Sequence, residues 1–247
     1  MRLLLINPNM TQTMTDSLAQ VARSVAGPEV AITALTASKG FPYIASRAEA
    51  QIAGGIVLEM IAAHQQEADA VIIAAFGDPG LIAARELFDL PVIGMAEAAV
   101  MSAAMLGERF AIVTFSPHMA RWYADSVRLT GLNSRFTGVR CPDTPPNSVA
   151  NVATELRNEL IALAAKATDT DGADVVILGG APLAGLAPQI ADSTSGILVD
   201  PIAAATAQAI ALASLKPCFR NRNAPPAAKT STGLEPELTA HIAGENR

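Results

Sequence analysis

ADAVIIAA (residues 68–75) and ADVVILGG (residues 173–180) are two versions of one sequence, 105 positions apart. Each is an apolar run with the length of a strand, too short for a helix and rich in Val and Ile. Uninterrupted apolar runs of this kind are typical of strands buried on both faces, as in parallel sheets. The pair therefore predicts one buried strand in each of two similar halves.

The match between the halves continues on both sides of these strands. Downstream, three matches keep the same offset: Gly80-Leu81 with Gly185-Leu186, Val92-Ile93 with Ile197-Leu198, and Ala98-Ala99 with Ala203-Ala204. Upstream, residues 2–6 match residues 109–113 at an offset of 107. One match between apolar strings would be chance, but several in register indicate an internal duplication.

Each half alternates short apolar runs with Ala-rich helical segments, which predicts βαβ units, parallel sheets and an α/β fold. Helices are expected near residues 12–26, 47–66, 80–88, 96–106, 118–131, 148–168 and 202–215. We expect lobe one at residues 1–100 and lobe two at residues 101–201, with the helix near 202–215 a candidate to pack back on lobe one. The composition of residues 217–247 predicts a poorly ordered tail with a short helix near Pro236.

The composition excludes several classes of partner. The net charge is −6 and Lys and Arg form no cluster, which argues against nucleic acid. No apolar run approaches the ~18 residues of a membrane span, and residues 1–6 indicate a first strand, not a signal peptide. Cys141 and Cys218 have no metal-ligand spacing and each lies beside a proline, so we expect a reducing cytoplasm and no disulfide framework.

A capping residue followed by proline occurs at four predicted strand ends: Asn7-Pro8, Asp78-Pro79, Ser116-Pro117 and Asp200-Pro201. Such a pair opens a helix, because the side chain accepts a bond from a free backbone N–H and proline needs no partner at the first helical position. Four such N-termini at the carboxyl ends of parallel strands would converge on one crevice. That crevice would favour carboxylates, ring carbonyls and oxyanions. For each residue, the alternative is a capping role alone.

Further polar residues follow the second strand of lobe one. Arg47 could clamp a substrate carboxylate with both prongs of its guanidinium, Glu49 could activate water, and Tyr43 adds a polar group beside them. Alternatively, Ser46 caps the helix that begins here and Glu49 completes a capping box.

Three candidates follow the first strand of lobe two. His118 is either a general acid or base or a solvated residue at a helix start. Thr114 can hydrogen-bond ring amides and carbonyls. Tyr123 either forms a wall of the pocket or belongs to the core.

Four motifs stand out along the chain: INPN at residues 6–9, FGDPGL at residues 76–81, Gly94 with Glu97-Ala98-Ala99, and Asp200-Pro201. Together they resemble the hydantoin and allantoin racemases of the aspartate/glutamate racemase superfamily. The resemblance covers about residues 1–215. It implies two flavodoxin-like lobes related by pseudo-twofold symmetry, with the active site between them. It also implies a small polar or anionic substrate, no cofactor or metal, and a homo-oligomer.

The sequence departs from this family at two positions. The family's racemases use two cysteines at equivalent strand ends, where this chain has Ala75 and Gly180, the latter followed by Ala181. Neither side chain can accept or donate a proton. We therefore expect water addition to a hydantoin-like or thiohydantoin ring with an acidic side chain, as in hydrolysis or desulfuration, with Glu49 or His118 as the base. The alternatives are a racemase with bases other than cysteine and a non-catalytic binding protein.

Overall fold

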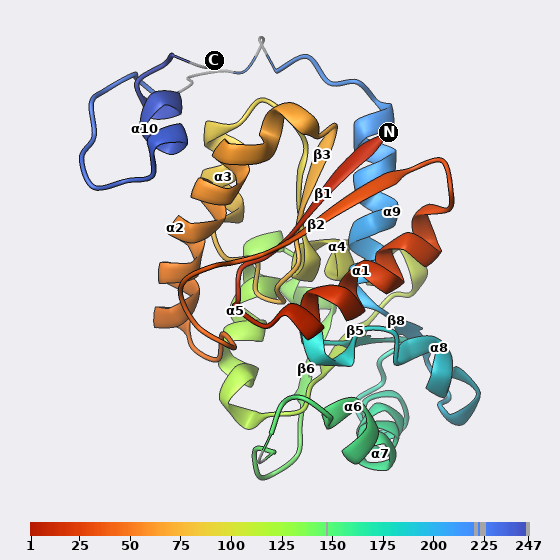
Figure 1. Cartoon of the computed structure of the whole chain (residues 1–247). Coiled ribbons are helices and arrows are strands. Elements are labelled where there is room, and N and C mark those ends of the chain that lie inside the picture. The colour runs from red at the N-terminus through yellow and green to blue at the C-terminus, as the bar shows by residue number, and fades with distance from the viewer. Residues whose placement is uncertain (147, 220–221, 223–225, 246–247) are drawn as a thin grey trace.

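Two parallel sheets of four strands each form the framework of the chain (Figure 1). The computed structural model describes residues 1–146, 148–219, 222 and 226–245. The first sheet has the order β2-β1-β3-β4 and contains β1 (Arg2–Asn7), β2 (Ala31–Thr36), β3 (Ala70–Ile73) and β4 (Val92–Gly94). The second has the order β6-β5-β7-β8 and contains β5 (Phe110–Val113), β6 (Phe136–Arg140), β7 (Val175–Leu178) and β8 (Ile197–Val199). The identical order confirms the predicted two-lobed α/β fold.

Helices connect the strands and cover the sheets. In the first half they are α1 (Gln12–Ala26), α2 (Arg47–His64), α3 (Leu81–Leu87) and α4 (Met95–Leu106). In the second half they are α5 (Ala120–Thr130), α6 (Val152–Glu155), α7 (Arg157–Asp169), α8 (Ala187–Ile190) and α9 (Pro201–Ser214). A helix lies at each of the predicted ranges, with the range 148–168 divided between α6 and α7.

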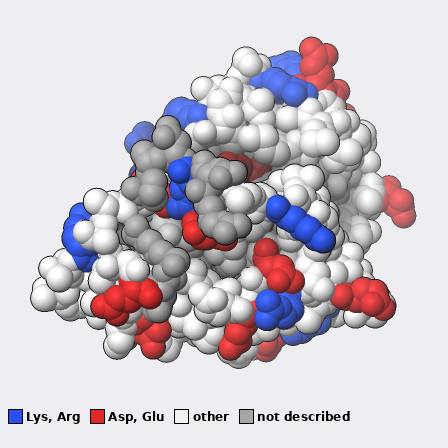
Figure 2. Space-filling model, turned by 90° about the horizontal axis from the view of Figure 1, so that it is seen from above, with Lys and Arg blue, Asp and Glu red and all other residues white. Residues whose placement is uncertain are grey.

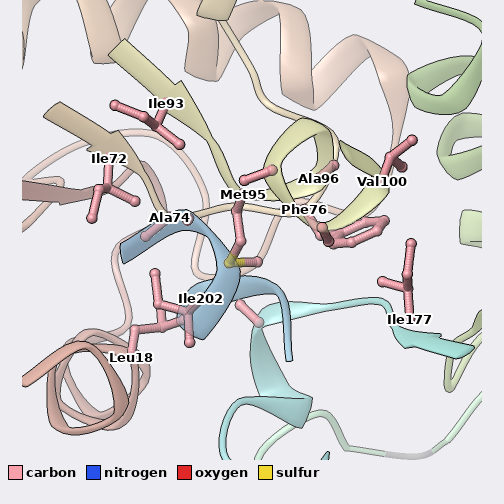
Figure 3. Packing of buried hydrophobic residues seen from close by; sticks show 14 of the residues in the cluster. Leu18, Ile72, Ala74, Phe76, Ile93, Met95, Ala96, Val100, Ile177 and Ile202 are labelled. Atoms are coloured by element: carbon pink, nitrogen blue, oxygen red, sulfur yellow. The ribbon is translucent and has the colours of Figure 1, made fainter. Parts of the chain in front are cut away.

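The largest hydrophobic core extends through both lobes. Its buried residues include Ile72 of β3 and Ile177 of β7. Figure 3 shows Phe76 between the end of the first sheet and Ile177, with Val100 of α4 beside it. All residues of β3 and β7 are buried, as their apolar sequences predict. The lobes are therefore packed together over an apolar interface.

Helices α4 and α9 cross between the lobes. These two helices lie at equivalent positions of the repeat and pack against each other. Gln208 of α9 donates hydrogen bonds to Ala98 O at 2.8 Å and to Ser102 Oγ at 3.1 Å of α4. Helix α4 also packs on β7 and β8, and α9 packs on β3 and β4. Each half of the chain thus ends in a helix that covers the sheet of the other half.

The segment after residue 216 contains one α-helix among its described residues. The short helix expected near Pro236 is present as α10 (Pro236–Ile242), which packs against α2. Leu238 joins a buried cluster, and His241 hydrogen-bonds Leu87 O at 2.9 Å and Gln65 Nε2 at 3.2 Å. The composition of the tail did not indicate these contacts, because they are made with residues about 150 or more positions away. Part of the tail, residues 220–221, 223–225 and 246–247, lies outside the described residues.

Basic and acidic side chains are interspersed on the face of the molecule shown in Figure 2. No helix among the described residues is long and apolar enough to cross a membrane.

Candidate active site

The carboxyl ends of β3 and β7 meet at the boundary between the lobes. Phe76 follows Ala75 at the end of β3, and a Cβ built on Gly179 at the end of β7 would lie 3.3 Å from Phe76 Cε1. Phe76 also packs edge-on against Tyr123 of α5, with ring centroids 4.5 Å apart. These contacts bring Ala75 and Gly180 to the same boundary, where both are buried.

Gly180 has no room for a side chain. Its φ of 127° lies in the region that favours glycine. A Cβ on Gly180 would lie 2.7 Å from Phe115 Cε1 and 3.5 Å from the Tyr123 hydroxyl oxygen. Phe115 therefore occupies the space that a Cβ at position 180 would need, and the Tyr123 hydroxyl lies in ordinary contact beside it. The next residue, Ala181, is also buried.

The hydroxyls of Tyr43, Thr114 and Tyr123 lie near one another, and that of Tyr123 lies beside Gly180. Burial raises the pKa of Tyr123, and the neighbouring hydroxyls of Tyr43 and Thr114 offset this effect only in part. Burial also raises the pKa of Tyr43 well above its usual value; its ring lies 6.1 Å from that of Phe115. Thr114 is fully buried, and its Oγ1 lies near Tyr123 without making a hydrogen bond of ordinary geometry. The group therefore presents neutral hydroxyls, one of which has an unused hydrogen-bonding capacity.

Asn7 and Asn9 follow β1 in a buried hydrogen-bond network. Asn7 Nδ2 donates to Asn9 Oδ1 at 3.0 Å and to Thr15 Oγ1 at 2.9 Å, and Asn9 N donates to Asn7 Oδ1 at 3.2 Å. The expectation that Asn7-Pro8 opens a helix is wrong, because α1 begins later with Thr11 at its N-cap. The amide of Asn7 instead fixes the loop between β1 and α1.

A cavity of about 600 Å³ contains the expected catalytic residues. It is lined by Ala45, Ser46, Arg47, Ala48, Glu49, His118 and Trp122. The negative charge of Glu49 adds a small contribution to the raised pKa of Tyr43, which burial mainly causes. The structure thus brings Arg47, Glu49 and His118 together from helices of both lobes.

Glu49 is held in a fixed position. Its backbone N–H donates to Ser46 Oγ at 3.2 Å, and its Oε2 accepts a bond from Ala45 N at 2.6 Å. These are the contacts of a capping box shifted by one residue, so the capping alternative for Glu49 is present in the structure. His118 lies in the 3-10 turn Pro117–Met119, where its side chain is exposed.

Arg47 spans the boundary between the lobes. Its Nε donates to Asp125 Oδ2 of α5 at 2.7 Å, and Arg128 binds the other oxygen of the same carboxylate. The sequence did not point to Asp125, because nothing near it in the chain indicates a partner 78 positions away. Arg47 is the lobe-one residue of this ion pair and also lines the cavity with Glu49.

Asp78 lies apart from Glu49 and His118. Its carboxylate accepts bonds from Ala96 N and Glu97 N of α4, both at 2.7 Å. The expected cap on its own helix is wrong, since α3 has Gly80 at its N-cap. Burial raises the pKa of Asp78 to about 7, against the effect of these two bonds. Asp78 lines a separate cavity of about 620 Å³, which shares Arg47 and Trp122 with the first.

The two remaining capping residues differ from one another. Asp200 caps α9 as expected, accepting bonds from Ile202 N at 3.0 Å and Ala203 N at 3.3 Å. Its other oxygen accepts a bond from Gly185 N at 2.5 Å, and burial raises its pKa. Ser116 stands at the N-cap of the turn Pro117–Met119 but makes no side-chain capping bond. Of the four expected caps, only Asp200 therefore binds the helix that follows it.

Cys141 and Cys218 are free, and burial raises the pKa of the Cys141 thiol. Among the described residues, no three or more His, Cys, Asp and Glu side chains form a group that could hold a metal ion.

The sequence pattern of the Asp/Glu/hydantoin racemase family matches residues 3–209. A hydantoin racemase of Paenarthrobacter aurescens is 32% identical over 217 residues, which cover 87% of this chain and 92% of that protein.

Two solved structures of allantoin racemases are similar to the whole molecule. The enzyme of Klebsiella pneumoniae has a TM-score of 0.89 and 32% identity, covering 96% of this chain and 98% of that one. The enzyme of Pseudomonas fluorescens has a TM-score of 0.87 and 31% identity, covering 94% of this chain and 100% of that one.

Proposed function

Because the chain belongs to the Asp/Glu/hydantoin racemase family, we propose that it binds a hydantoin-like ring between its lobes and adds water to a ring carbon without a cofactor. Hydantoin and allantoin racemases among its relatives support the choice of a five-membered ring with amide carbonyls. Arg47 beside the cavity supports an acidic side chain on that ring. A homo-oligomer is part of the proposal, and light scattering tests it.

Water addition is favoured over racemisation by one observation: the lobe boundary carries Ala75 and Gly180. Racemisation of a carbon acid requires a proton acceptor on one face of the ring and a proton donor on the other. Neither residue can fill these roles, and the space beside Gly180 is occupied by Phe115 and Tyr123. Loss of a positioned base typically costs about 10²–10⁴-fold in rate.

Glu49 is our candidate for the base that activates water. Its carboxylate is held by Ala45 N at 2.6 Å in the cavity that Arg47 and His118 also line. Glu49 takes a proton from water while the water oxygen attacks the ring carbon, and the oxygen or sulfur on that carbon takes up the electron pair. As the new C=O bond then forms, the proton held by Glu49 passes to the leaving group. When it passes to the ring nitrogen, the C–N bond breaks and the ring opens. When it passes to the sulfur of a thiohydantoin, the C–S bond breaks, the new hydroxyl loses its proton and hydrogen sulfide is released. His118 is the second candidate for this base.

Racemisation by bases other than cysteine is the second candidate function, because the relatives matched over most of this chain are racemases.

One experiment distinguishes water addition from racemisation. Hydantoins and 2-thiohydantoins with carboxymethyl or carboxyethyl side chains are incubated with the protein in D₂O and followed by NMR and mass spectrometry.

We expect products that contain one added water, or free sulfide, with little deuterium at the α-carbon. Rapid deuterium incorporation with the ring otherwise unchanged would establish racemisation and overturn water addition. Glu49→Gln protein prepared in the same way serves as the matched control for contaminating activities.

A further inference from the structure

We infer that the hydroxyl of Tyr123, which lies beside position 180, donates a hydrogen bond to the ring oxygen or sulfur that gains charge during the reaction. The inference rests on the proposed function for its substrate class. It assigns the stabilisation of the developing anion to a named group.

The hydroxyl of Tyr123 lies at the boundary between the lobes, where the ring is proposed to bind. Its hydroxyl oxygen lies 3.5 Å from the Cβ that a side chain at Gly180 would have. Position 180 follows β7, as Ala75 follows β3, so the hydroxyl lies at the strand end where the two lobes meet. Tyr123 belongs to α5, and its phenol enters this space from a different element than the strand itself.

The ring of Tyr123 is held rigidly by its neighbours. It packs edge-on against Phe76 with centroids 4.5 Å apart and lies 5.7 Å from the ring of Trp122. Only 1% of the residue is exposed. A donor fixed in this way needs little reorganisation when charge develops on a substrate, which is the condition for strong transition-state stabilisation.

The hydroxyl of Thr114 also indicates that a ligand atom binds beside Tyr123. Its Oγ1 is fully buried, lies near the Tyr123 hydroxyl, and has no hydrogen-bond partner. A buried hydroxyl without a partner has lost its hydrogen bonds to water without replacing them, which is a cost to stability. A ligand atom in hydrogen-bond reach of both Thr114 and Tyr123 would remove this cost.

Tyr123 acts as a donor and not as a base. Burial raises the pKa of its phenol, so the O–H is retained at neutral pH. Tyr123 keeps its proton throughout the step: it hydrogen-bonds the charged oxygen or sulfur while Glu49 holds the proton from water. The same donor would stabilise the enolate of a ring that loses its α-proton, so the role does not depend on which reaction the protein catalyses.

The test removes each hydroxyl while preserving shape. Tyr123→Phe and Thr114→Val are compared with Thr206→Val, a matched control that deletes a buried hydroxyl in α9, where Thr206 bonds Ile202 O at 2.8 Å. We expect Tyr123→Phe to lower kcat about 10²–10³-fold with a small change in KM, as for loss of an oxyanion donor. Thr114→Val should change kcat in the same direction, while Thr206→Val should leave kcat unchanged.

The readouts separate this inference from the proposed function. If the wild-type protein only exchanges the α-proton of the ring, the proposal of water addition is wrong. The inference about Tyr123 then still requires that Tyr123→Phe slows this exchange. If the wild-type protein turns over no ring, its Kd for a hydantoin is compared with that of Tyr123→Phe by calorimetry. Equal rates, or equal Kd values in the last case, would overturn the inference. If Tyr123→Phe does not fold, as its thermal midpoint will show, Thr114→Val decides by the same criteria.

Discussion

At the scale of single residues, Asp78 combines a buried carboxyl with a backbone φ of 50°. Two backbone N–H groups of α4 bind its oxygens, yet burial raises its pKa to about 7. In the unfolded chain, the pKa of this carboxyl is near its ordinary value of 3.8. At a pH between these two pKa values, the Asp78 carboxyl is protonated in the folded protein and ionised in the unfolded chain.

The contribution of Asp78 to stability therefore depends on pH. A raised pKa in the folded state gives stability that is fully present below about pH 4 and is lost as pH rises through about 7. We expect the difference in unfolding free energy between wild type and Asp78→Asn to decrease from pH 4 to pH 8. Asn suits the positive φ and has no charge to titrate. Urea denaturation across this range measures the difference; a constant or rising difference would contradict the assignment.

The two candidates for the base can also be separated at this scale. Glu49→Gln preserves an oxygen that can accept the Ala45 N–H, so it removes basicity while retaining the cap. We expect kcat to fall about 10²-fold. His118→Asn, at an exposed position, should change kcat much less. Initial rates of both variants are measured with the substrate that the NMR experiment identifies. If His118→Asn lowers kcat more than Glu49→Gln does, His118 is the base.

At the scale of elements, the sequence predicted helices and strands well because their signals are local. Alternating apolar runs and Ala-rich segments located β3, β7 and the helices between them. The caps were predicted less well. Asp78 binds α4 instead of α3, because a loop with positive φ turns its carboxyl toward a distant helix. No local pattern encodes such a partner.

Helix α10 shows the same limitation and offers a test. Leu238 is 3% exposed and packs in the cluster that contains Phe88, whereas Leu234 is 41% exposed. Truncating a buried Leu to Ala costs about 2–5 kcal/mol. We expect Leu238→Ala to speed amide hydrogen exchange throughout α10, while Leu234→Ala leaves it unchanged. Equal exchange in the two variants would show that Leu238 does not hold the helix in place.

At the scale of the whole molecule, one exposed ion pair joins the lobes beside the cavity. Arg47 and Asp125 come from α2 and α5, and Asp125 occupies the guanidinium that a substrate carboxylate would need. The repeat and the family motifs predicted that a site lies between two lobes. They did not predict this contact or the filling of the boundary by Phe115 and Tyr123, since both depend on how two distant segments pack.

Competition for Arg47 can be measured. An exposed ion pair is worth about 0.2–1 kcal/mol, so Asp125→Asn should lower KM for a ring with a carboxylate by up to about fivefold. KM for the matching uncharged ring should stay the same. Arg47→Lys should raise KM for the charged ring only, because an ammonium cannot reproduce the two-pronged contact. If both variants shift KM equally for charged and uncharged rings, Arg47 does not bind the carboxylate.

The crossing of α4 and α9 has a consequence for the origin of this molecule. If a half-length ancestor existed before the duplication, its last helix covered the sheet of another copy, because a lone half leaves an apolar sheet face open to water. Such an ancestor would be a helix-exchanged homodimer with two identical strand ends at its dyad, and fusion of the two copies would remove the requirement for identity. In this chain the two strand ends differ, since one carries Ala75 and the other carries Gly180 with Phe115 against it.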